Sequence, residues 1–396
     1  MPDRTKHITI GLEACIQQRP PVLDSARFGL LMNQASVTHD LHHACDVLAD
    51  AYPGQLTALF SPQHGLWGEA QANMIESPHA RHARLGIPIH SLYSETRRPT
   101  PEMLDGLDCL VVDLQDVGTR VYTFIWTVQQ CLVACAEAGV PVVILDRPNP
   151  LGGRLVEGAW LEPDFRSFVG GACIPMRHGL TIGELALLIN DELDINVSLD
   201  VVPMHRWQRD DLFDTLDRAW IAPSLNLRRF EAALTYPGQV LLEGTNLSEG
   251  RGTTQPFEAV GAPFLDPEEL CVTANNLALP GVRFLPTRFR PTFDKWHGES
   301  CGGVSLHVTD AEAFRPYRTT LALLAAIRES HPAEFTWLDP PYEYETLKPP
   351  IDIISGSATL RETLDRTETL GGALLDELSD ACEAEWWGRA RNYLLY

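Results

Sequence analysis

Residues 109–146 read CLVVDLQDVGTRVYTFIWTVQQCLVACAEAGVPVVILD, and this stretch decides the fold class. It begins with the apolar run Cys109–Asp113 and ends with a second apolar run over 142–146. Between them, residues 122–138 carry apolar side chains at helical spacing, and Gly139-Val-Pro ends the helix. Two apolar strands joined by a crossover helix form a βαβ unit, which predicts neighbouring parallel strands.

Similar apolar runs lie upstream, over residues 28–33, 56–60 and 88–93, and each ends in polar or turn residues. Runs of this length suit strands that are buried on both faces of a parallel sheet. Downstream, Thr181-Ile-Gly-Glu184 has the spacing of a capping box and opens an apolar helix over 185–193. Repeated strand–helix–strand units predict an α/β fold with a doubly wound, mostly parallel sheet.

The character of the sequence changes near Arg228, where Pro223-Ser-Leu-Asn and Tyr236-Pro-Gly are typical of a junction. The chain has 396 residues, which is long for one ordinary domain. We therefore predict two domains, residues 1–232 with the parallel sheet and residues 233–396 as a smaller α/β domain.

The second half carries more proline and loop than the first. We expect a strand over 304–308 and helices over 311–331 and 360–378. The tail from Trp386 onward is rich in aromatic residues and arginine, and we expect it to dock on the body of the protein.

The amino-acid composition limits which classes of binding partner are expected. The net charge of −22 disfavours nucleic acid and anionic membranes and favours a small ligand as the partner. The nine cysteines include no C-x-x-C pair, so we expect neither a disulfide framework nor a structural metal site. Cys109 and Cys131 lie in apolar runs and are expected in the core. No signal-peptide pattern and no run of eighteen apolar residues is present, which predicts a cytoplasmic protein without a membrane span.

Polar side chains gather where the predicted strands end, and ligands of open parallel sheets bind at that edge. The polar and glycine residues at these ends are Asn33, Gln34, Gln63, His64, Gly68, Glu69, Asp113, Gln115, Asp116, Arg120, Asp146, Arg147 and Asn149. The chain lacks a G-x-G-x-x-G after a strand, a P-loop, a G-x-S-x-G elbow and an H-E-x-x-H motif. These absences disfavour a dinucleotide enzyme, a P-loop enzyme, a serine hydrolase of that type and a zincin. His39, His42 and His43 are expected on a solvated helix face.

Paired carboxylates are the remaining candidates for catalytic groups. Glycoside hydrolysis requires a proton donor together with a second carboxyl group. Glu69 follows Trp67, whose ring can desolvate it and stack on a sugar; alternatively Glu69 is a loop carboxylate that caps a helix. Asp116 lies just past a strand end together with Arg120. Arg120 either binds a substrate carboxylate or neutralises Asp116. Asp113 is expected to end its strand or cap the next helix.

The segment that begins with Leu242-Glu-Gly-Thr-Asn-Leu-Ser-Glu-Gly-Arg-Gly-Thr-Thr contains several glycines, two glutamates, an asparagine and an arginine. Ordering such a loop costs conformational entropy, which favours a functional loop over a plain turn system. A loop from the second domain that covers the strand ends of the first would create an interdomain cleft.

Several motifs together resemble a known family. They are Ser61-Pro-Gln-His-Gly, Asp113-Leu-Gln-Asp-Val-Gly-Thr-Arg-Val-Tyr-Thr, Leu145-Asp-Arg-Pro-Asn-Pro, Arg177-His-Gly-Leu-Thr-Ile-Gly-Glu, Glu243-Gly-Thr-Asn-Leu-Ser-Glu-Gly-Arg-Gly-Thr-Thr, Pro291-Thr-Phe and Cys301-Gly-Gly-Val. The chain resembles the exo-β-N-acetylmuramidases of the NamZ type (glycoside hydrolase family 171, formerly a domain of unknown function) from about residue 8 to the end.

The resemblance implies a Rossmann-like first domain, a smaller α/β second domain and a site between them. It implies a glycoside hydrolase that releases terminal N-acetylmuramic acid from the non-reducing end of peptidoglycan fragments, without metal or organic cofactor. The expected substrate-binding residues are Asn33, Gln63, His64, Glu76, Gln115, Arg120, Tyr122, Asn149, His178, Glu243, Asn246, Glu249 and Arg251. Arg120 or Arg251 is expected to bind the lactyl carboxylate. The oligomeric state is left open.

One position departs from the pattern expected of the family, which is Pro-Glu-His-Gly where this chain has Pro62-Gln63-His64-Gly65. If that glutamate is the family's acid, this chain lacks it. If the acid lies in the following Gly-Asp/Glu-Ala segment, Glu69 supplies it. We favour Glu69 as general acid, because an amide cannot transfer a proton, with Glu76 in reserve. Asp116 would be the second acid, or would orient water or the acetamido group.

Two other classes of function remain. The first is a non-catalytic amino-sugar-binding or sensor protein, in which Gln63 replaces the catalytic acid. Such a protein would bind muramic acid without hydrolysing it. An amidase that uses His64 and His178 around a metal ion would carry about one bound ion per site.

Overall fold

The computed structural model describes residues 6–70, 75–367 and 370–396. The first half of the chain forms a seven-stranded sheet in the order β3-β4-β2-β1-β5-β6-β7. All neighbouring pairs run parallel except β3 and β4. The strands are β1 (Phe28–Met32), β2 (Leu56–Ser61), β3 (Ala80–Arg81), β4 (Pro88–Ser91), β5 (Cys109–Asp113), β6 (Val142–Leu145) and β7 (Leu199–Val202).

Successive side chains of the central strands alternate between two cores, one on each face of the sheet. In β1, Leu31 packs into one core and Leu30 into the other, and Val112 and Val111 of β5 divide in the same way. The helices α1 (Gly11–Gln18) and α2 (Ala44–Ala51) cover one face. The opposite face is covered by α3 (Pro101–Leu104), α4 (Phe124–Ala138) and α5 (Ile182–Glu192).

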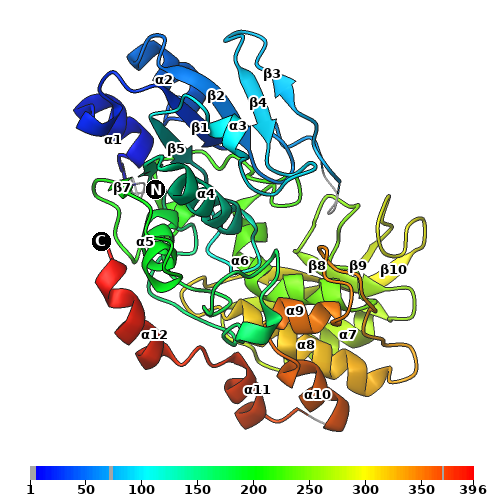
Figure 1. The fold of residues 1–396 in the computed structure, drawn as a ribbon. Helices are drawn as coiled ribbons and strands as arrows, with labels where there is room; N and C mark the ends of the chain where they lie inside the picture. The colour runs from blue at the N-terminus through cyan, green and yellow to red at the C-terminus, as the bar shows by residue number, and fades with distance from the viewer. Residues whose placement is uncertain (1–5, 71–74, 368–369) are drawn as a thin grey trace.

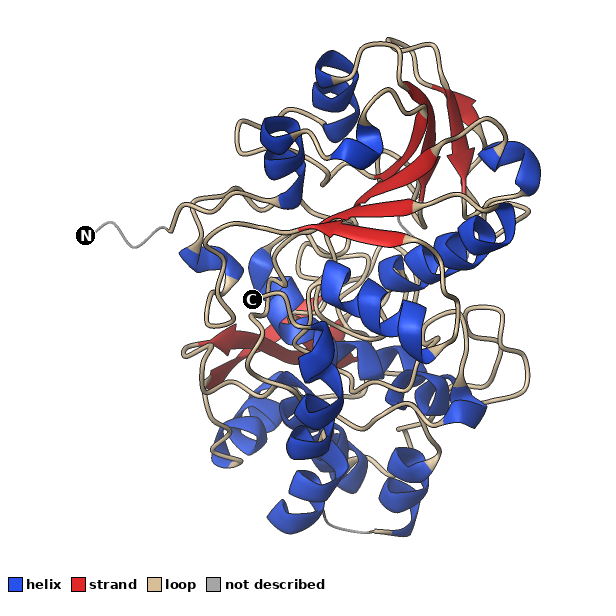
Figure 2. Ribbon diagram, turned by 60° about the vertical axis from the view of Figure 1, so that its left-hand side comes forward, coloured by secondary structure: helices blue, strands red, loops and turns tan. Residues whose placement is uncertain are grey.

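The predicted fold class is confirmed, because strands occupy all five apolar runs and helices lie on both faces (Figure 2). The Thr181 hydroxyl caps α5 by accepting from the backbone N–H of Glu184, as the capping-box spacing predicts. The edge strands β3 and β7 were not predicted. Both residues of β3 are exposed, only one of the four residues of β7 is buried, and no continuous apolar run marks either strand. Cys109 and Cys131 are buried free thiols, as expected.

The second half contains a smaller antiparallel sheet in the order β8-β10-β9. Its strands are β8 (Ala259–Ala262), β9 (Val282–Phe289) and β10 (Cys301–Val308). Its helices are α6 (Phe230–Gln239), α7 (Pro267–Asn276), α8 (Pro316–Ser330), α9 (Pro350–Ser355), α10 (Thr359–Arg366) and α11 (Gly372–Ser379). The predicted boundary at 232 falls inside α6, which leads into the short helix η4 (Val240–Gly244).

The C-terminal segment returns from the second half to the first, as the course of the chain in Figure 1 shows. Its helix α12 (Glu383–Ala390) buries Trp386 completely, and the indole Nε1 donates to the carbonyl of His178 at 2.8 Å. The expected docking of this tail is confirmed.

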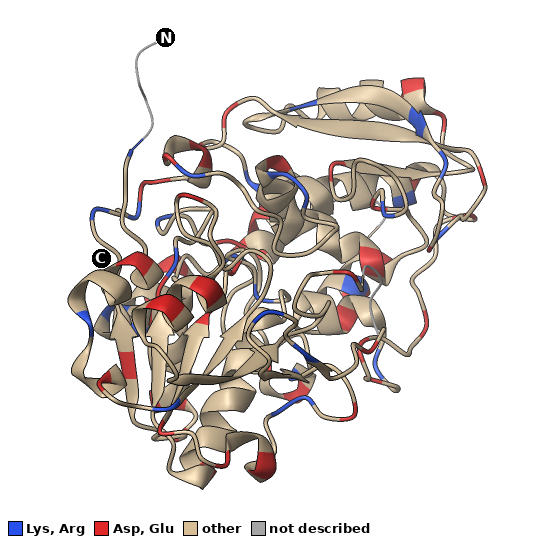
Figure 3. Cartoon of the chain, turned by 90° about the horizontal axis from the view of Figure 1, so that it is seen from above, with Lys and Arg blue, Asp and Glu red and all other residues tan. Residues whose placement is uncertain are grey.

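Acidic positions are spread over helices and loops of both halves (Figure 3), so the net charge of −22 is distributed over the molecule. Among the described helices, none is long and apolar enough to span a membrane.

Candidate active site

A small pocket of about 30 Å³ is lined by residues from both halves of the chain. We call it the central pocket. The first half contributes residues that follow β2 and β5, and the second half contributes the loop after η4 and the segment before α9. The polar and aromatic residues that line it are Gln63, His64, Tyr122, Thr123, Ser224, Asn226, Tyr236, Glu243, Arg251, Phe257, Tyr342 and Glu343.

A larger, more open cavity of about 390 Å³ adjoins the central pocket and shares Glu243, Arg251, Tyr342 and Glu343 with it. Its remaining charged lining includes Glu249 and Lys295. The four shared residues form a wall that faces both spaces. A ligand in the open cavity can therefore contact the same four residues that border the central pocket.

Glu343 reaches the central pocket from a strained two-residue turn. The backbone N–H of Tyr342 donates to the carbonyl of Glu345 at 2.8 Å, and the N–H of Glu345 donates back at 2.9 Å. The two central residues, Glu343 and Tyr344, have φ angles of 42° and 72°. Hairpin turns of this kind normally carry asparagine or glycine there, since other residues lose on the order of 1 kcal/mol each. Strain of this kind clusters at functional sites.

The carboxyl group of Glu343 is buried and held by two neutral donors. The hydroxyl of Tyr93 donates to Oε2 at 3.1 Å, and the amide of Gln63 reaches Oε1 at 3.4 Å. Burial, reinforced by the nearby negative charge of Glu243, raises the pKa of Glu343 to about 7. Near neutral pH this carboxyl group is therefore partly protonated, which is the state that a proton donor requires.

Glu243 is held differently, although it faces the same pocket. Its Oε1 lies 2.6 Å from Nη2 of Arg251, and the hydroxyl of Tyr342 donates to Oε2 at 2.8 Å. Burial raises the pKa of Glu243, and the guanidinium of Arg251 opposes that shift. Because the ion pair is short and the tyrosine donates to the carboxylate, we assign Glu243 the charged form.

Arg251 and Lys295 also neutralise a second carboxylate, Glu249. Nζ of Lys295 lies 2.7 Å from Oε2 of Glu249, and Nε of Arg251 lies 3.5 Å from Oε1. Burial alone would raise the pKa of Glu249, but these two cations bring it below its ordinary value. The wall between the two spaces thus contains two carboxylates and two cations next to the partly protonated Glu343.

The first half contributes neutral hydrogen-bonding groups to the central pocket. Oε1 of Gln63 accepts from the hydroxyl of Thr123 at 2.7 Å. Nδ1 of His64 lies 2.7 Å from the carbonyl of Ala70, and burial lowers the pKa of His64 to about 4. His64 is therefore a neutral imidazole at physiological pH.

Comparison with known proteins assigns the family. The family model described as "Exo-beta-N-acetylmuramidase NamZ, N-terminal" matches residues 28–231, and its C-terminal counterpart matches residues 234–396. The chain belongs to the exo-β-N-acetylmuramidase NamZ family.

Individual relatives agree with the NamZ assignment. The peptidoglycan β-N-acetylmuramidase NamZ of Bacillus subtilis (strain 168) is 44% identical over 331 residues, covering 84% of this chain and 80% of that protein. Two crystal structures of DUF1343 family proteins from Bacteroides fragilis are also similar. One has a TM-score of 0.88 at 30% identity, with 98% of this chain and 99% of that chain covered. The other has a TM-score of 0.77 at 27% identity, with 99% of both chains covered.

Within this NamZ-family fold, five of the predicted site residues line the central pocket: Gln63, His64, Tyr122, Glu243 and Arg251. Glu249 lines the adjoining cavity.

The other four amides among the predicted residues lie outside the central pocket and serve the fold. Asn33 donates to the carbonyl of Pro223 and Asn149 to that of Leu180, at 2.8 and 2.9 Å. Asn246 donates to Glu334, and Gln115 donates to Pro148 and lines a separate cavity. Each amide satisfies backbone carbonyls of the loops that surround the site, which is a supporting role.

Arg120 requires a correction, because neither predicted role fits its surroundings. Its Nη1 donates to the carbonyls of Ala159 and Ile174, and its Nη2 donates to those of Ile354 and Ser355, all at 2.7–2.9 Å. The side chain is fully buried, and burial lowers its pKa to about 10. Arg120 joins backbone segments of the two halves and does not face a substrate.

Asp116 and His178 are buried behind the pocket wall and do not line it. Oδ2 of Asp116 accepts from the backbone of Gly118 at 2.8 Å and lies 3.7 Å from Nε2 of His178. Burial raises the pKa of Asp116 to about 7 and lowers that of His178 to about 3. Asp113 ends β5 as expected, but its carboxylate pairs with Arg147 at 2.5 Å and caps no helix.

Glu69 also requires a correction. Its side chain is exposed, and the carboxylate lies close to Gly65 outside the pocket lining. Trp67 does not desolvate it, because the indole packs against His43 and His82. Glu76 is exposed as well and pairs with Arg97 at 3.3 Å. The structure therefore gives neither residue the buried environment that a proton donor needs.

Potential metal ligands gather in two places in the described part of the chain, and neither includes His64 or His178. The exposed group is His7, His39 and Asp217, and the more buried one is Cys45, Asp46 and His82. Nδ1 of His82 accepts from the backbone of Leu85, so the neutral ring carries its proton on Nε2, the atom nearest Cys45. A metal at Nε2 would require loss of that proton, which disfavours this site.

Sequence reasoning missed Glu343, Tyr342, Tyr236 and Lys295. Glu343 lies in Pro341-Tyr-Glu-Tyr-Glu, far from any predicted strand end, and the turn lacks the Asn-Gly or Asp-Gly pattern that announces a hairpin. The alternation of tyrosine and glutamate is the local cue that was available.

Proposed function

We propose that this chain is an exo-acting glycosidase that releases terminal N-acetylmuramic acid from the non-reducing end of peptidoglycan fragments. Glu343 is the proton donor and Glu243 the second carboxyl group. The proposal combines the family, whose named Bacillus subtilis relative acts on peptidoglycan, with a pair of carboxyl groups in one pocket.

The observation that carries the assignment is the contrast between these two carboxyl groups. Glu343 has neutral donors around it and a raised pKa, whereas Glu243 has a guanidinium at 2.6 Å. Environments that separate the protonation states of two neighbouring carboxyl groups are the arrangement that glycosidases use.

The proposed reaction follows from the protonation states of Glu343 and Glu243. Protonated Glu343 transfers its proton to the glycosidic oxygen as the bond to the anomeric carbon breaks. The carboxylate of Glu243 stabilises the positive charge that develops on the sugar ring. Water then adds its oxygen to the anomeric carbon, and the proton that water loses passes to an ionised carboxylate. Arg251 faces the pocket and is the arginine that we propose for the lactyl carboxylate; Arg120 is excluded by its burial.

The test compares two aryl β-N-acetylmuramic acid glycosides, one with a poor leaving group and one with an activated nitrophenol that needs no protonation. Glu343→Gln should lower kcat/KM on the poor leaving group by about 10²–10⁴-fold and on the activated one by less than about tenfold. In the wild type, kcat/KM should fall above about pH 7, and the variant should lose this dependence.

The matched control is Glu345→Gln, whose carboxylate accepts from the backbone N–H groups of Leu347 and Lys348 and lies outside the pocket. It should retain wild-type rates. An equal loss on both glycosides would exclude Glu343 as proton donor. The N-acetylglucosamine analogue tests the sugar: its hydrolysis at a similar rate would contradict specificity for muramic acid. Tight binding of muramic acid without hydrolysis by the wild type would favour the sensor alternative.

A further inference from the structure

We infer that Tyr344 is a stacking platform for the leaving sugar, the pyranose on the other side of the bond that is cut. The inference rests on the proposed glycosidase function and extends it to the recognition of the leaving group. Tyr344 follows the proton donor directly in the chain and is 48% exposed.

An arginine fixes the position of this ring. The guanidinium carbon of Arg97 lies 4.6 Å from the ring centre of Tyr344 and 4.3 Å from that of Tyr93. Nη2 of Arg97 also donates to the hydroxyl of Tyr344 at 2.5 Å and reaches Glu76 at 3.3 Å. The guanidinium thus contacts both rings, whose centres lie 6.1 Å apart at an interplanar angle of 64°, and these cation–π contacts stabilise the group. A ring held in this way loses little entropy when a ligand binds to it.

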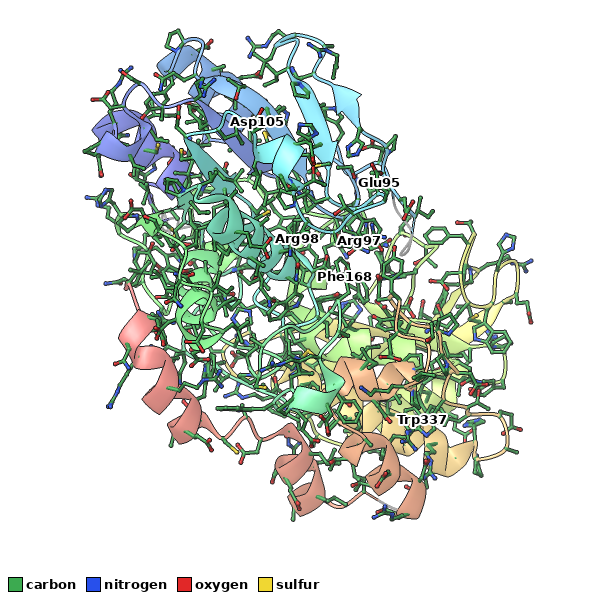
Figure 4. The ribbon with its side chains drawn as sticks, viewed as in Figure 1. Glu95, Arg97, Arg98, Asp105, Phe168 and Trp337 are labelled. Atoms are coloured by element: carbon green, nitrogen blue, oxygen red, sulfur yellow. The ribbon has the colours of Figure 1, made fainter. Side chains whose placement is uncertain are left out.

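Phe168 completes an aromatic group around Arg97. Its ring centre lies 5.6 Å from that of Tyr93 and 6.1 Å from that of Tyr344, with an interplanar angle of 86° in the second pair. Arg97 and Phe168 lie close together between the two halves of the molecule in Figure 4. Arg97, Tyr93 and Phe168 thus hold the Tyr344 ring in place, and about half of its side chain remains exposed to a ligand.

This aromatic group is mechanically linked to the proposed proton donor. Tyr93, which packs on Arg97, donates to the Glu343 carboxyl group, and Val169, next to Phe168, lines the central pocket. A general acid must lie at the oxygen that joins the two sugars. An aromatic ring one residue away from that acid is therefore within reach of the sugar next to the cleaved bond.

The exposure of Tyr344 indicates whether its ring contacts the terminal sugar or the leaving sugar. The carboxyl groups of Glu243 and Glu343, which act on the terminal sugar, are buried, whereas Tyr344 is exposed. In an exo-acting enzyme the rest of the substrate extends toward solvent, so the exposed ring faces the leaving sugar. Aromatic rings bind the apolar face of a β-linked pyranose such as N-acetylglucosamine. The strain of a tyrosine at a φ of 72° also indicates a function for this position.

The experiment compares two substrates that differ in the leaving group alone: the β-1,4-linked disaccharide of N-acetylmuramic acid and N-acetylglucosamine, and β-N-acetylmuramyl fluoride. Tyr344→Ala should raise KM for the disaccharide about 5- to 20-fold, the effect of losing one stacking contact. The same variant should change kcat/KM for the fluoride by less than about twofold. Tyr344→Trp should restore binding of the disaccharide. Leu347→Ala, which removes an exposed apolar side chain nearby, should leave both substrates unaffected.

The following outcomes would contradict the proposal that Tyr344 stacks on the leaving sugar. An equal loss on both substrates would mean that Tyr344 acts by shaping the Glu343 turn, with the proposed function intact. Unchanged KM on both would mean that the ring contacts no leaving group. If the wild type hydrolyses neither substrate, the proposed function fails, and calorimetric binding of the disaccharide still tests the platform. Equal affinity of wild type and Tyr344→Ala would then overturn it, whereas weaker binding by the variant would support it.

Discussion

The first half of the chain and the loop after η4 in the second half each bury an arginine, and they use it in opposite ways. Arg120 donates to four backbone carbonyls and has its pKa lowered by burial. Arg251 pairs with Glu243 and Glu249, which together hold its pKa above the ordinary value against the effect of burial. An arginine whose partners are neutral backbone carbonyls stabilises the fold. An arginine whose partners are carboxylates at the border of a pocket can take part in the chemistry.

Replacing each arginine by methionine should separate these roles with the largest effects. Arg120→Met removes hydrogen bonds from four backbone carbonyls, of which that of Ile174 still accepts from the N–H of Leu161. Each buried carbonyl left without a donor costs about 1–3 kcal/mol, so the variant should melt roughly 5–10 °C lower or fail to fold. Arg251→Met should lower kcat/KM by about 10²-fold or more, because the charge that opposes Glu243 is lost. It should also lower the melting temperature, because it takes a cation from two buried carboxylates. Thermal unfolding and hydrolysis of a muramic acid glycoside measure the two effects.

Arg120→Lys keeps this comparison testable if the methionine variant does not fold. A lysine retains the charge and satisfies fewer carbonyls, so it should melt between wild type and Arg120→Met with normal activity per folded molecule. A large loss of kcat/KM in folded Arg120→Lys would place Arg120 in the chemistry. Wild-type activity in Arg251→Met would remove Arg251 from it.

A second comparison sets Glu343 against Glu345, two residues apart on the same turn. The pKa of Glu343 is raised in the folded protein, so its contribution to stability is present at acidic pH and is lost as the pH rises through about 7. The pKa of Glu345 is lowered, mainly by the N–H group of Leu347, so its contribution has the opposite sign. Glu343→Gln should therefore raise the melting temperature relative to wild type by about 1–4 °C at pH 8.5 and by less at pH 5.

Glu345→Gln should give no such gain at pH 8.5. Differential scanning calorimetry of wild type and both variants at the two pH values measures the difference. A gain for Glu343→Gln that is equal at pH 5 and pH 8.5 would show that the carboxyl group does not ionise in this range. The assignment of Glu343 as proton donor would then lose its physical basis.

The parallel sheet was predictable because its strands are buried on both faces and leave continuous apolar runs such as Cys109–Asp113. The rule that ligands bind beyond the strand ends located Gln63, His64 and Tyr122 at the pocket, and loop composition located Glu243 and Arg251. The direction in which a side chain points cannot be predicted from this sequence, so a substrate carboxylate or Asp116 is the expected partner of Arg120, whereas its partners are backbone carbonyls. Glu343 was missed because a strained turn without glycine leaves no turn signal.

Replacement of Glu69, which lies in the first half, is expected to have the smallest effect on kcat/KM. Its position just past β2, next to a tryptophan, is what a sequence argument for a proton donor requires, yet the side chain is exposed and Trp67 packs elsewhere. An exposed carboxyl group lacks the desolvated surroundings of a general acid. Glu69→Gln should therefore keep kcat/KM within about twofold of wild type on the same poor-leaving-group glycoside that reveals the loss in Glu343→Gln. A loss of about 10²-fold in Glu69→Gln would mean that this loop closes over the substrate and buries Glu69 in the complex. The proton donor would then come from the first half, as the sequence alone suggested.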